Sequence, residues 1–183
     1  MIVGVGGQGS LLASKLLGTL LVNEGFDVKV SEVHGMSQRG GSVVTYVRYG
    51  DKVFSPVVDK GQADIIVAFE LLEAARWLSY LSPGGKIIAN TQQIDPMPVI
   101  TGAAKYPENL ADKMAAMGAD VDAVDALSLS AQAGSSKAVN IVLMGRLSNY
   151  FTFPKEAWDR ALEETVPAGF LEMNKRAFEL GIK

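Results

Sequence analysis

The chain has 183 residues, 48% of them hydrophobic and 20% charged, which is the length and composition of one ordinary globular domain. It contains no cysteine and only one histidine, which excludes thiolate-held iron–sulfur clusters, disulfides, cysteine nucleophiles and zinc sites built from several histidines. The net charge of -3 gives no indication of a nucleic-acid partner. No apolar run is long enough to span a membrane and no targeting segment precedes the first strand, so we expect a cytoplasmic protein.

The first thirty residues have the pattern of a strand, a loop, a helix and a second strand. Residues 1–5 are apolar and mostly β-branched, which is typical of a short buried strand. Leucines repeat every four residues over 10–24, and Gly25 follows as a helix stop. Val28 and Val30 then share one face of the next strand. The size of this unit predicts a βαβ arrangement.

The remainder of the chain predicts further strands and helices. Two short alternating runs, 43–49 and 52–54, flank Gly50 and Asp51 and predict a hairpin. Patterning then predicts strands at 64–69, 86–90 and 121–127, helices at 71–81, 109–117 and 137–150, a turn at 83–85, a loop at 92–107 with an extended piece at 99–100, and amphipathic helix from 154 with a break at 166–167. The prediction is a single α/β domain over residues 1–183, in which helices cover a mostly parallel sheet.

A glycine-rich loop lies between the first strand and the first helix. Its residues are Gly4, Gly6, Gly7, Gln8 and Gly9, which contain the pattern G-x-G-x-x-G. Glycines allow a phosphate to approach the backbone closely, and the free N–H groups of the following helix favour an anion. One hypothesis is therefore a dinucleotide, CoA or phosphate site, to which the amide of Gln8 donates a hydrogen bond. The alternative is that the glycines only allow the helix to pack closely on the strand.

Glu32 follows the second strand, about twenty residues after this loop, where NAD enzymes place the acid that binds ribose. An NAD(P)-binding Rossmann dehydrogenase is therefore an alternative function. Glu32 can instead orient His34 or Arg39, which follow it in a polar stretch. The single histidine also leaves no obvious catalytic base for a dehydrogenase.

The polar stretch that follows concentrates loop residues with long polar reach. It consists of His34, Gly35, Met36, Ser37, Gln38, Arg39, Gly40, Gly41 and Ser42. Ordering a loop so rich in glycine costs conformational entropy, and such loops often carry function. The guanidinium of Arg39 can offer two parallel donors to a carboxylate or phosphate. We expect a ligand-facing or subunit-interface role; the alternative is a solvated turn in which Arg39 pairs with Glu32 or Asp59.

Asn140 is an amide within the apolar helix predicted at 137–150, so it must find hydrogen-bond partners. It is interpreted as a structural amide that ties this helix to a loop, or more specifically as a contact of the glycine loop. Lys137, three residues earlier, can add an anion site at the start of the helix, although solvation is the simpler expectation.

Two motifs together carry a family resemblance. The sequences Gly-Val-Gly-Gly-Gln-Gly and Ser-Glu-Val-His-Gly-Met-Ser-Gln-Arg-Gly-Gly-Ser-Val resemble the gamma subunits of 2-oxoacid:ferredoxin oxidoreductases, which act on pyruvate and other ketoacids, and the small subunit of indolepyruvate ferredoxin oxidoreductase. The resemblance extends over nearly the whole chain, including residues 63–67 and Asn140. It implies a Rossmann-like three-layer sandwich with a hairpin insertion, and with the C-terminal helices from about residue 154 packed on it.

The resemblance also implies what the chain does and what it leaves to partners. Such a complex oxidatively decarboxylates a 2-oxoacid to an acyl-CoA and CO2 and passes electrons to ferredoxin. Thiamine diphosphate and the iron–sulfur clusters are expected on other subunits, while this subunit helps to form the CoA or active-site region and is inactive alone. The expected partners are those subunits and, through the complex, ferredoxin; a homodimer is a further candidate. The glycine loop, the run from Glu32 to Ser42 and Asn140 are carried over as the binding surface, with no catalytic residue and no metal ligand.

Overall fold

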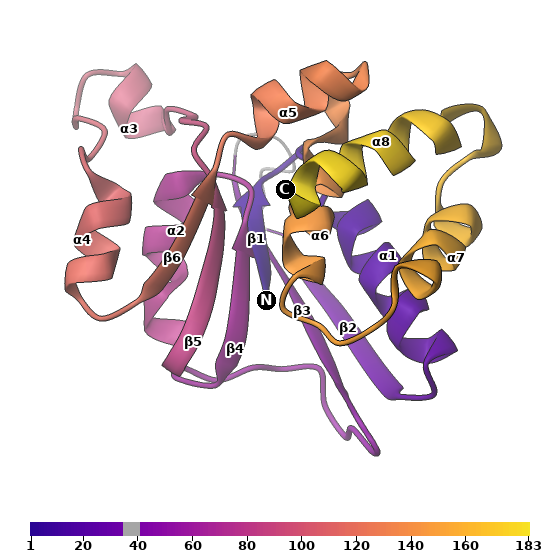
Figure 1. Ribbon diagram of the computed structural model, residues 1–183. Helices are drawn as coiled ribbons and strands as arrows, with labels where there is room; N and C mark the ends of the chain where they lie inside the picture. The colour runs from indigo at the N-terminus through magenta and orange to yellow at the C-terminus, as the bar shows by residue number, and fades with distance from the viewer. Residues whose placement is uncertain (35–40) are drawn as a thin grey trace.

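A single six-stranded sheet runs through the part of the chain that the computed structural model describes, residues 1–34 and 41–183 (Figure 1). The strands are β1 (Ile2–Val5), β2 (Asp27–His34), β3 (Ser42–Gly50), β4 (Ala63–Ala68), β5 (Leu81–Asn90) and β6 (Asp120–Val124). Their order across the sheet is β2-β3-β1-β4-β5-β6. Strands β1, β4, β5 and β6 are parallel to one another, whereas β3 is antiparallel to both of its neighbours, β1 and β2.

Helices cover both faces of this sheet. They are α1 (Ser10–Asn23), α2 (Leu71–Trp77), α3 (Met97–Ile100), α4 (Leu110–Ala116), α5 (Ala126–Ala133), α6 (Val139–Ser148), α7 (Lys155–Thr165) and α8 (Leu171–Ile182). One core lies between the sheet and helices α1 and α5 to α8, and a second lies under α2 and α4 (Figure 1). The predicted α/β sandwich of three layers with a mostly parallel sheet is confirmed. None of the helices in the described ranges is long and apolar enough to cross a membrane.

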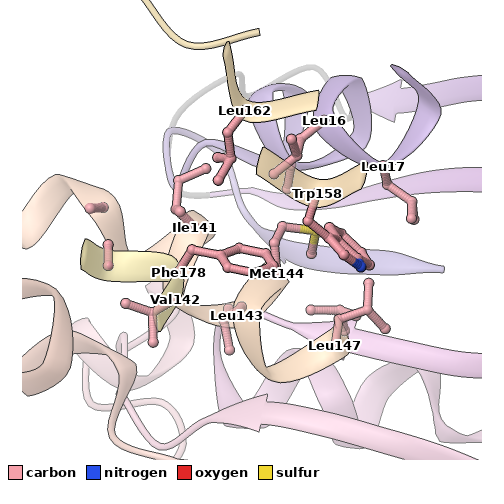
Figure 2. Close-up of a cluster of buried hydrophobic side chains, with 14 of the residues drawn as sticks. Leu16, Leu17, Ile141, Val142, Leu143, Met144, Leu147, Trp158, Leu162 and Phe178 are labelled. Atoms are coloured by element: carbon pink, nitrogen blue, oxygen red, sulfur yellow. The ribbon is translucent and has the colours of Figure 1, made fainter. Parts of the chain in front are cut away.

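The larger core depends on helix α6, which is buried nearly all round, as its continuous apolar sequence predicts. Met144 and Leu147 of this helix lie beside the rings of Trp158 and Phe178, which come from α7 and α8 (Figure 2). The centroids of the two rings are 5.4 Å apart. Helix α8 thus packs on α6, and helix α7 packs mainly against α1.

The hairpin differs from the predicted one. Strand β3 pairs with β2 along eight residues, from Asp27 opposite Gly50 to His34 opposite Val43, and the predicted partner run at 52–54 forms no strand. Eight paired positions offer far more backbone hydrogen bonds than three. Strand β3 therefore pairs with β2, although residues 52–54 lie nearer in sequence. The predicted βαβ unit is also altered, because β3 lies between β1 and β2.

Four local predictions were wrong in extent or type. Helix α2 ends at Trp77 in a 3-10 turn, and the predicted turn at 83–85 lies inside β5, which begins at Leu81 beside a register irregularity. The extended piece at 99–100 belongs to helix α3, which has a proline near its start, where a missing N–H costs nothing. The strand predicted at 121–127 stops at Val124, because the Asp125 carboxylate accepts a hydrogen bond from the Ser128 N–H at 3.0 Å and begins helix α5.

Candidate functional site at the carboxyl edge of the sheet

The carboxyl ends of β1, β4, β5 and β6 meet at one edge of the sheet, called here the carboxyl edge. The end of β2 and the start of antiparallel β3 reach the same edge. Ligand sites of open α/β sheets lie outside this edge. The glycine loop after β1 and both ends of the polar stretch therefore come to one place.

The glycine loop is held by the side chain of Gln8. Its Oε1 accepts a hydrogen bond from the Val5 N–H at 2.7 Å, and its Nε2 donates to the Phe69 carbonyl at 3.0 Å. A β-carbon on Gly4 would lie 2.9 Å from that Oε1, so Gly4 leaves room for the amide. The Gln8 amide was predicted to donate to a ligand, but it donates to the Phe69 carbonyl and so attaches the loop to the end of β4.

Asn140 contacts the glycine loop. Its Nδ2 donates to the Gly9 carbonyl at 3.3 Å, and its Oδ1 accepts from the Ile141 N–H at 2.9 Å. The two interpretations of Asn140 therefore describe the same contact, since the loop to which it ties α6 is the glycine loop.

The two sequence motifs meet through one backbone hydrogen bond. The Gly6 N–H donates to the Gly41 carbonyl at 2.9 Å, and Ser42 lies opposite Val5 in the sheet. The remaining predicted site residues of this stretch, Gly35, Met36, Ser37, Gln38, Arg39 and Gly40, and the side chain of His34, lie outside the described residues.

Glu32 does not occupy the position of a ribose-binding acid. It lies in β2 opposite Thr45 of β3, so a whole strand separates it from β1. With strands about 4.8 Å apart, Glu32 is displaced by roughly 10 Å across the sheet from the strand that carries the glycine loop. In dinucleotide-binding folds the acid follows the strand next to β1. The interpretation of Glu32 as the ribose-binding acid of an NAD(P) dehydrogenase is therefore wrong.

Sequence reasoning missed a buried carboxylate at this edge. Glu70 follows β4 and is 1% exposed. It accepts hydrogen bonds from the Glu73 N–H at 2.9 Å, from the Ile94 N–H at 3.2 Å and from the Tyr106 hydroxyl. Burial, and then the contact with Glu70, raise the pKa of that hydroxyl well above its usual range. The position of Glu70 directly after a buried strand was the sequence signal that could have indicated this residue.

A second missed residue is Asn90, the last residue of β5. Its Nδ2 donates at 3.2 Å to the Phe69 carbonyl, which also accepts from Gln8, and its Oδ1 accepts from the Ala126 N–H at 3.1 Å. Through these bonds the glycine loop, β4, β5 and α5 form one hydrogen-bonded framework. Such a framework holds the edge in a defined geometry.

A cleft of about 440 Å³ opens between the glycine loop, the segment after β5 and the start of α6. It is lined by Gly7, Gln8, Gly9, Gln92, Ile94, Leu127, Ser136, Lys137 and Val139. Lys137 is exposed and brings a positive charge, and Ser136 and Gln92 add neutral donors. Donors of this kind suit an anionic group with an apolar neighbour.

The donor set does not suit the metal-containing cofactors of redox enzymes. The chain has no cysteine for an iron–sulfur cluster. Across residues 1–34 and 41–183, moreover, His, Asp and Glu side chains form no group of three that can hold a metal ion.

The chain resembles known proteins along its entire length. The family model described as pyruvate ferredoxin/flavodoxin oxidoreductase matches residues 1–183. The chain is 43% identical to the indolepyruvate oxidoreductase subunit IorB of Thermococcus kodakarensis, over 100% of the chain and 93% of that protein. It is 25% identical to the pyruvate/ketoisovalerate oxidoreductases common subunit gamma of the same organism, over 96% of the chain and 90% of the relative.

Solved structures share the fold. The gamma subunit of a keto/oxoacid ferredoxin oxidoreductase from Geobacter sulfurreducens superposes with a TM-score of 0.71 at 23% identity, over 98% of this chain and 93% of that one. The 2-oxoglutarate:ferredoxin oxidoreductase of Magnetococcus marinus superposes with a TM-score of 0.70 at 18% identity, over 99% of this chain and 29% of that one. The same three-layer fold therefore occurs both as a separate chain and as part of a larger one.

Proposed function

The chain belongs to the pyruvate ferredoxin/flavodoxin oxidoreductase family, and on this basis we propose that residues 1–183 form one gamma-type subunit of a 2-oxoacid:ferredoxin oxidoreductase. The complex oxidatively decarboxylates a 2-oxoacid to an acyl-CoA and CO2 and reduces ferredoxin. The observation that carries this proposal is the 43% identity to an oxidoreductase subunit over the full length of the chain.

The chemistry of the chain supports a division of labour within that complex. Thiamine diphosphate supplies the carbanion chemistry of decarboxylation and iron–sulfur clusters carry the electrons, and this chain has no cysteine with which to hold a cluster. We place both groups on partner subunits. The contribution of this subunit is to bind and to orient.

We assign the carboxyl edge to that contribution. The cleft beside the glycine loop takes an anionic group, for which the phosphates of CoA are the best candidate, with donors from Gln92, Ser136 and Lys137. We also propose that the run from Glu32 to Ser42 contributes to an interface with a partner subunit. Gln8 and Asn140 hold the loop through hydrogen bonds to the Phe69 and Gly9 carbonyls.

Reconstitution tests the assignment as a subunit. The purified chain is expected to contain no thiamine and no iron and to show no turnover. Addition of the partner subunits from the same organism should restore reduction of an electron acceptor that depends on a 2-oxoacid. Reduction of NAD by the isolated chain, or full activity of the partners without it, would refute the proposal.

A charge reversal tests the cleft. In the reconstituted complex, Lys137→Glu should raise the KM for CoA by about tenfold, the effect of roughly 1.4 kcal/mol of lost binding, with little change in kcat. Lys113→Glu is the matched control, since Lys113 is an exposed lysine of α4 on the opposite face of the sheet. If both substitutions change the KM for CoA equally, or if neither changes it, the assignment of an anion site to this cleft is contradicted.

A further inference from the structure

Helix α2 brings a second buried carboxylate to the carboxyl edge. Glu73, in the first turn of the helix, is only 4% exposed. It accepts hydrogen bonds from the Ser42 hydroxyl and, at 3.0 Å, from Nε of Arg76. A charge buried to this extent is costly unless its partners are well placed, so the position needs an explanation beyond helix formation.

The contacts of Glu73 lead to the glycine loop in two steps. Ser42, which donates to Glu73, also accepts a hydrogen bond from the indole Nε1 of Trp77 at 3.4 Å. Ser42 is the first residue of β3, and the residue before it, Gly41, accepts the Gly6 N–H at 2.9 Å. One serine hydroxyl and one peptide unit therefore separate the carboxylate of α2 from the backbone of the loop.

We propose that Glu73 is a positioning residue: by holding Ser42 and thus the Gly41 carbonyl, it sets the orientation of Gly6 and of the glycine loop that borders the anion cleft. This inference rests on the proposed function of that cleft. Glu73 is not among the residues that line the cleft. Its effect on binding is therefore indirect.

The direction in which the anion affinity changes distinguishes a positioning role of Glu73 from a purely electrostatic one. Removal of a negative charge near an anion site, with nothing else changed, strengthens anion binding because a repulsion is lost. Loss of the position of Gly41 weakens binding, because the Gly6 N–H and its neighbours no longer point in fixed directions. Weaker binding after removal of Glu73 is thus the result that the charge alone does not produce.

Calorimetry on the full chain, with CoA as the probe, measures this sign. Glu73→Ala should weaken CoA binding by about fivefold or more, roughly 1 kcal/mol. Glu73→Gln keeps an oxygen for the Ser42 hydroxyl and should stay within about twofold of wild type. Asn174→Ala is the control for a lost buried hydrogen bond elsewhere, since Asn174 donates to the Phe170 carbonyl in the C-terminal helices. Unchanged or tighter binding in Glu73→Ala would overturn the proposal.

Amide hydrogen exchange tests the same relay without any ligand. The Gly6 N–H should exchange about tenfold faster in Glu73→Ala and in Ser42→Ala than in wild type, and should stay protected in Glu73→Gln and Asn174→Ala. Equal protection in all variants refutes the positioning role. If the wild-type chain does not bind CoA although Gly6 responds to Glu73, the cleft assignment fails and the positioning role stands.

Discussion

The side-chain amide of Asn140 lies directly against Gly9: Nδ2 donates to the Gly9 carbonyl at 3.3 Å, and a β-carbon on Gly9 would lie 2.8 Å from that nitrogen. Gly9 also has a φ of 88°, a left-handed conformation that costs other residues energy. The loop and the start of α6 are therefore fitted to each other across 131 residues of sequence.

This contact predicts different costs for two neighbouring glycines. Gly7 has a φ of 100° but has open space where a β-carbon would lie. Gly7→Ala should lower the free energy of unfolding by about 1–2 kcal/mol, the conformational cost alone. Gly9→Ala should cost about 1–3 kcal/mol more, because the amide of Asn140 must also move. Urea denaturation measures both, and equal losses would show that the Asn140 contact does not matter.

The crossing of α6 and α8 predicts the most damaging of these substitutions. A β-carbon on Gly145 would lie 2.1 Å from the carbonyl oxygen of Phe178, which is backbone and has no rotamer to change. Gly145→Ala should therefore force the helices apart and destabilise the protein by about 3 kcal/mol or more. Gly169→Ala is the control, since nothing lies within 4 Å of its β-carbon position. Thermal unfolding of the pair compares them, and similar midpoints would contradict the close crossing.

The buried acid Glu70 predicts that charge, as well as shape, matters at the carboxyl edge. Glu70→Gln replaces one carboxylate oxygen by an NH2 group that faces backbone N–H donors and the Tyr106 hydroxyl. We expect a loss of about 1–3 kcal/mol in the free energy of unfolding. Tyr106→Phe removes one donor and should cost about 1 kcal/mol. A Glu70→Gln protein as stable as wild type would mean that this carboxylate is not a required acceptor.

The ion pair between β6 and α6 predicts a dependence of stability on pH. Burial by itself raises the pKa of Asp122, but hydrogen bonds from Arg146 at 2.8 and 2.9 Å and from the Tyr150 hydroxyl at 2.7 Å outweigh it and lower the pKa below the ordinary value of 3.8. A lowered pKa in the folded state stabilises the protein fully above the unfolded value, and this contribution is lost as the pH falls through the folded value.

The measurement compares wild type with Asp122→Asn by urea denaturation. Wild type should be the more stable protein by a constant margin between about pH 5 and 8, and the margin should shrink below about pH 4. Lys155→Gln serves as the control for an exposed ion pair, because Lys155 pairs with Asp159 of α7 and with Glu179 of α8. A margin that stays the same down to pH 3 would show that the pKa of Asp122 is not lowered by folding.

Local patterns in the sequence determined much of this protein. Leucines at helical spacing predicted α1, and a continuous apolar run predicted the buried helix α6. The absence of cysteine limited the cofactors that the chain can hold, and the glycine loop together with the run from Glu32 to Ser42 indicated the family. These features are local because helical period, turn chemistry and ligand chemistry are properties of neighbouring residues.

Only the tertiary structure decided which strands pair and which polar groups become buried. The choice of β2 as the partner of β3 depends on the free energy of a whole ladder, which no short run of residues reveals. That choice moved Glu32 away from β1 and contradicts its interpretation as a ribose-binding acid. Likewise, Glu70 and Glu73 have the sequence character of surface acids until the sheet edge surrounds them with donors, because burial is set by the packing of distant segments.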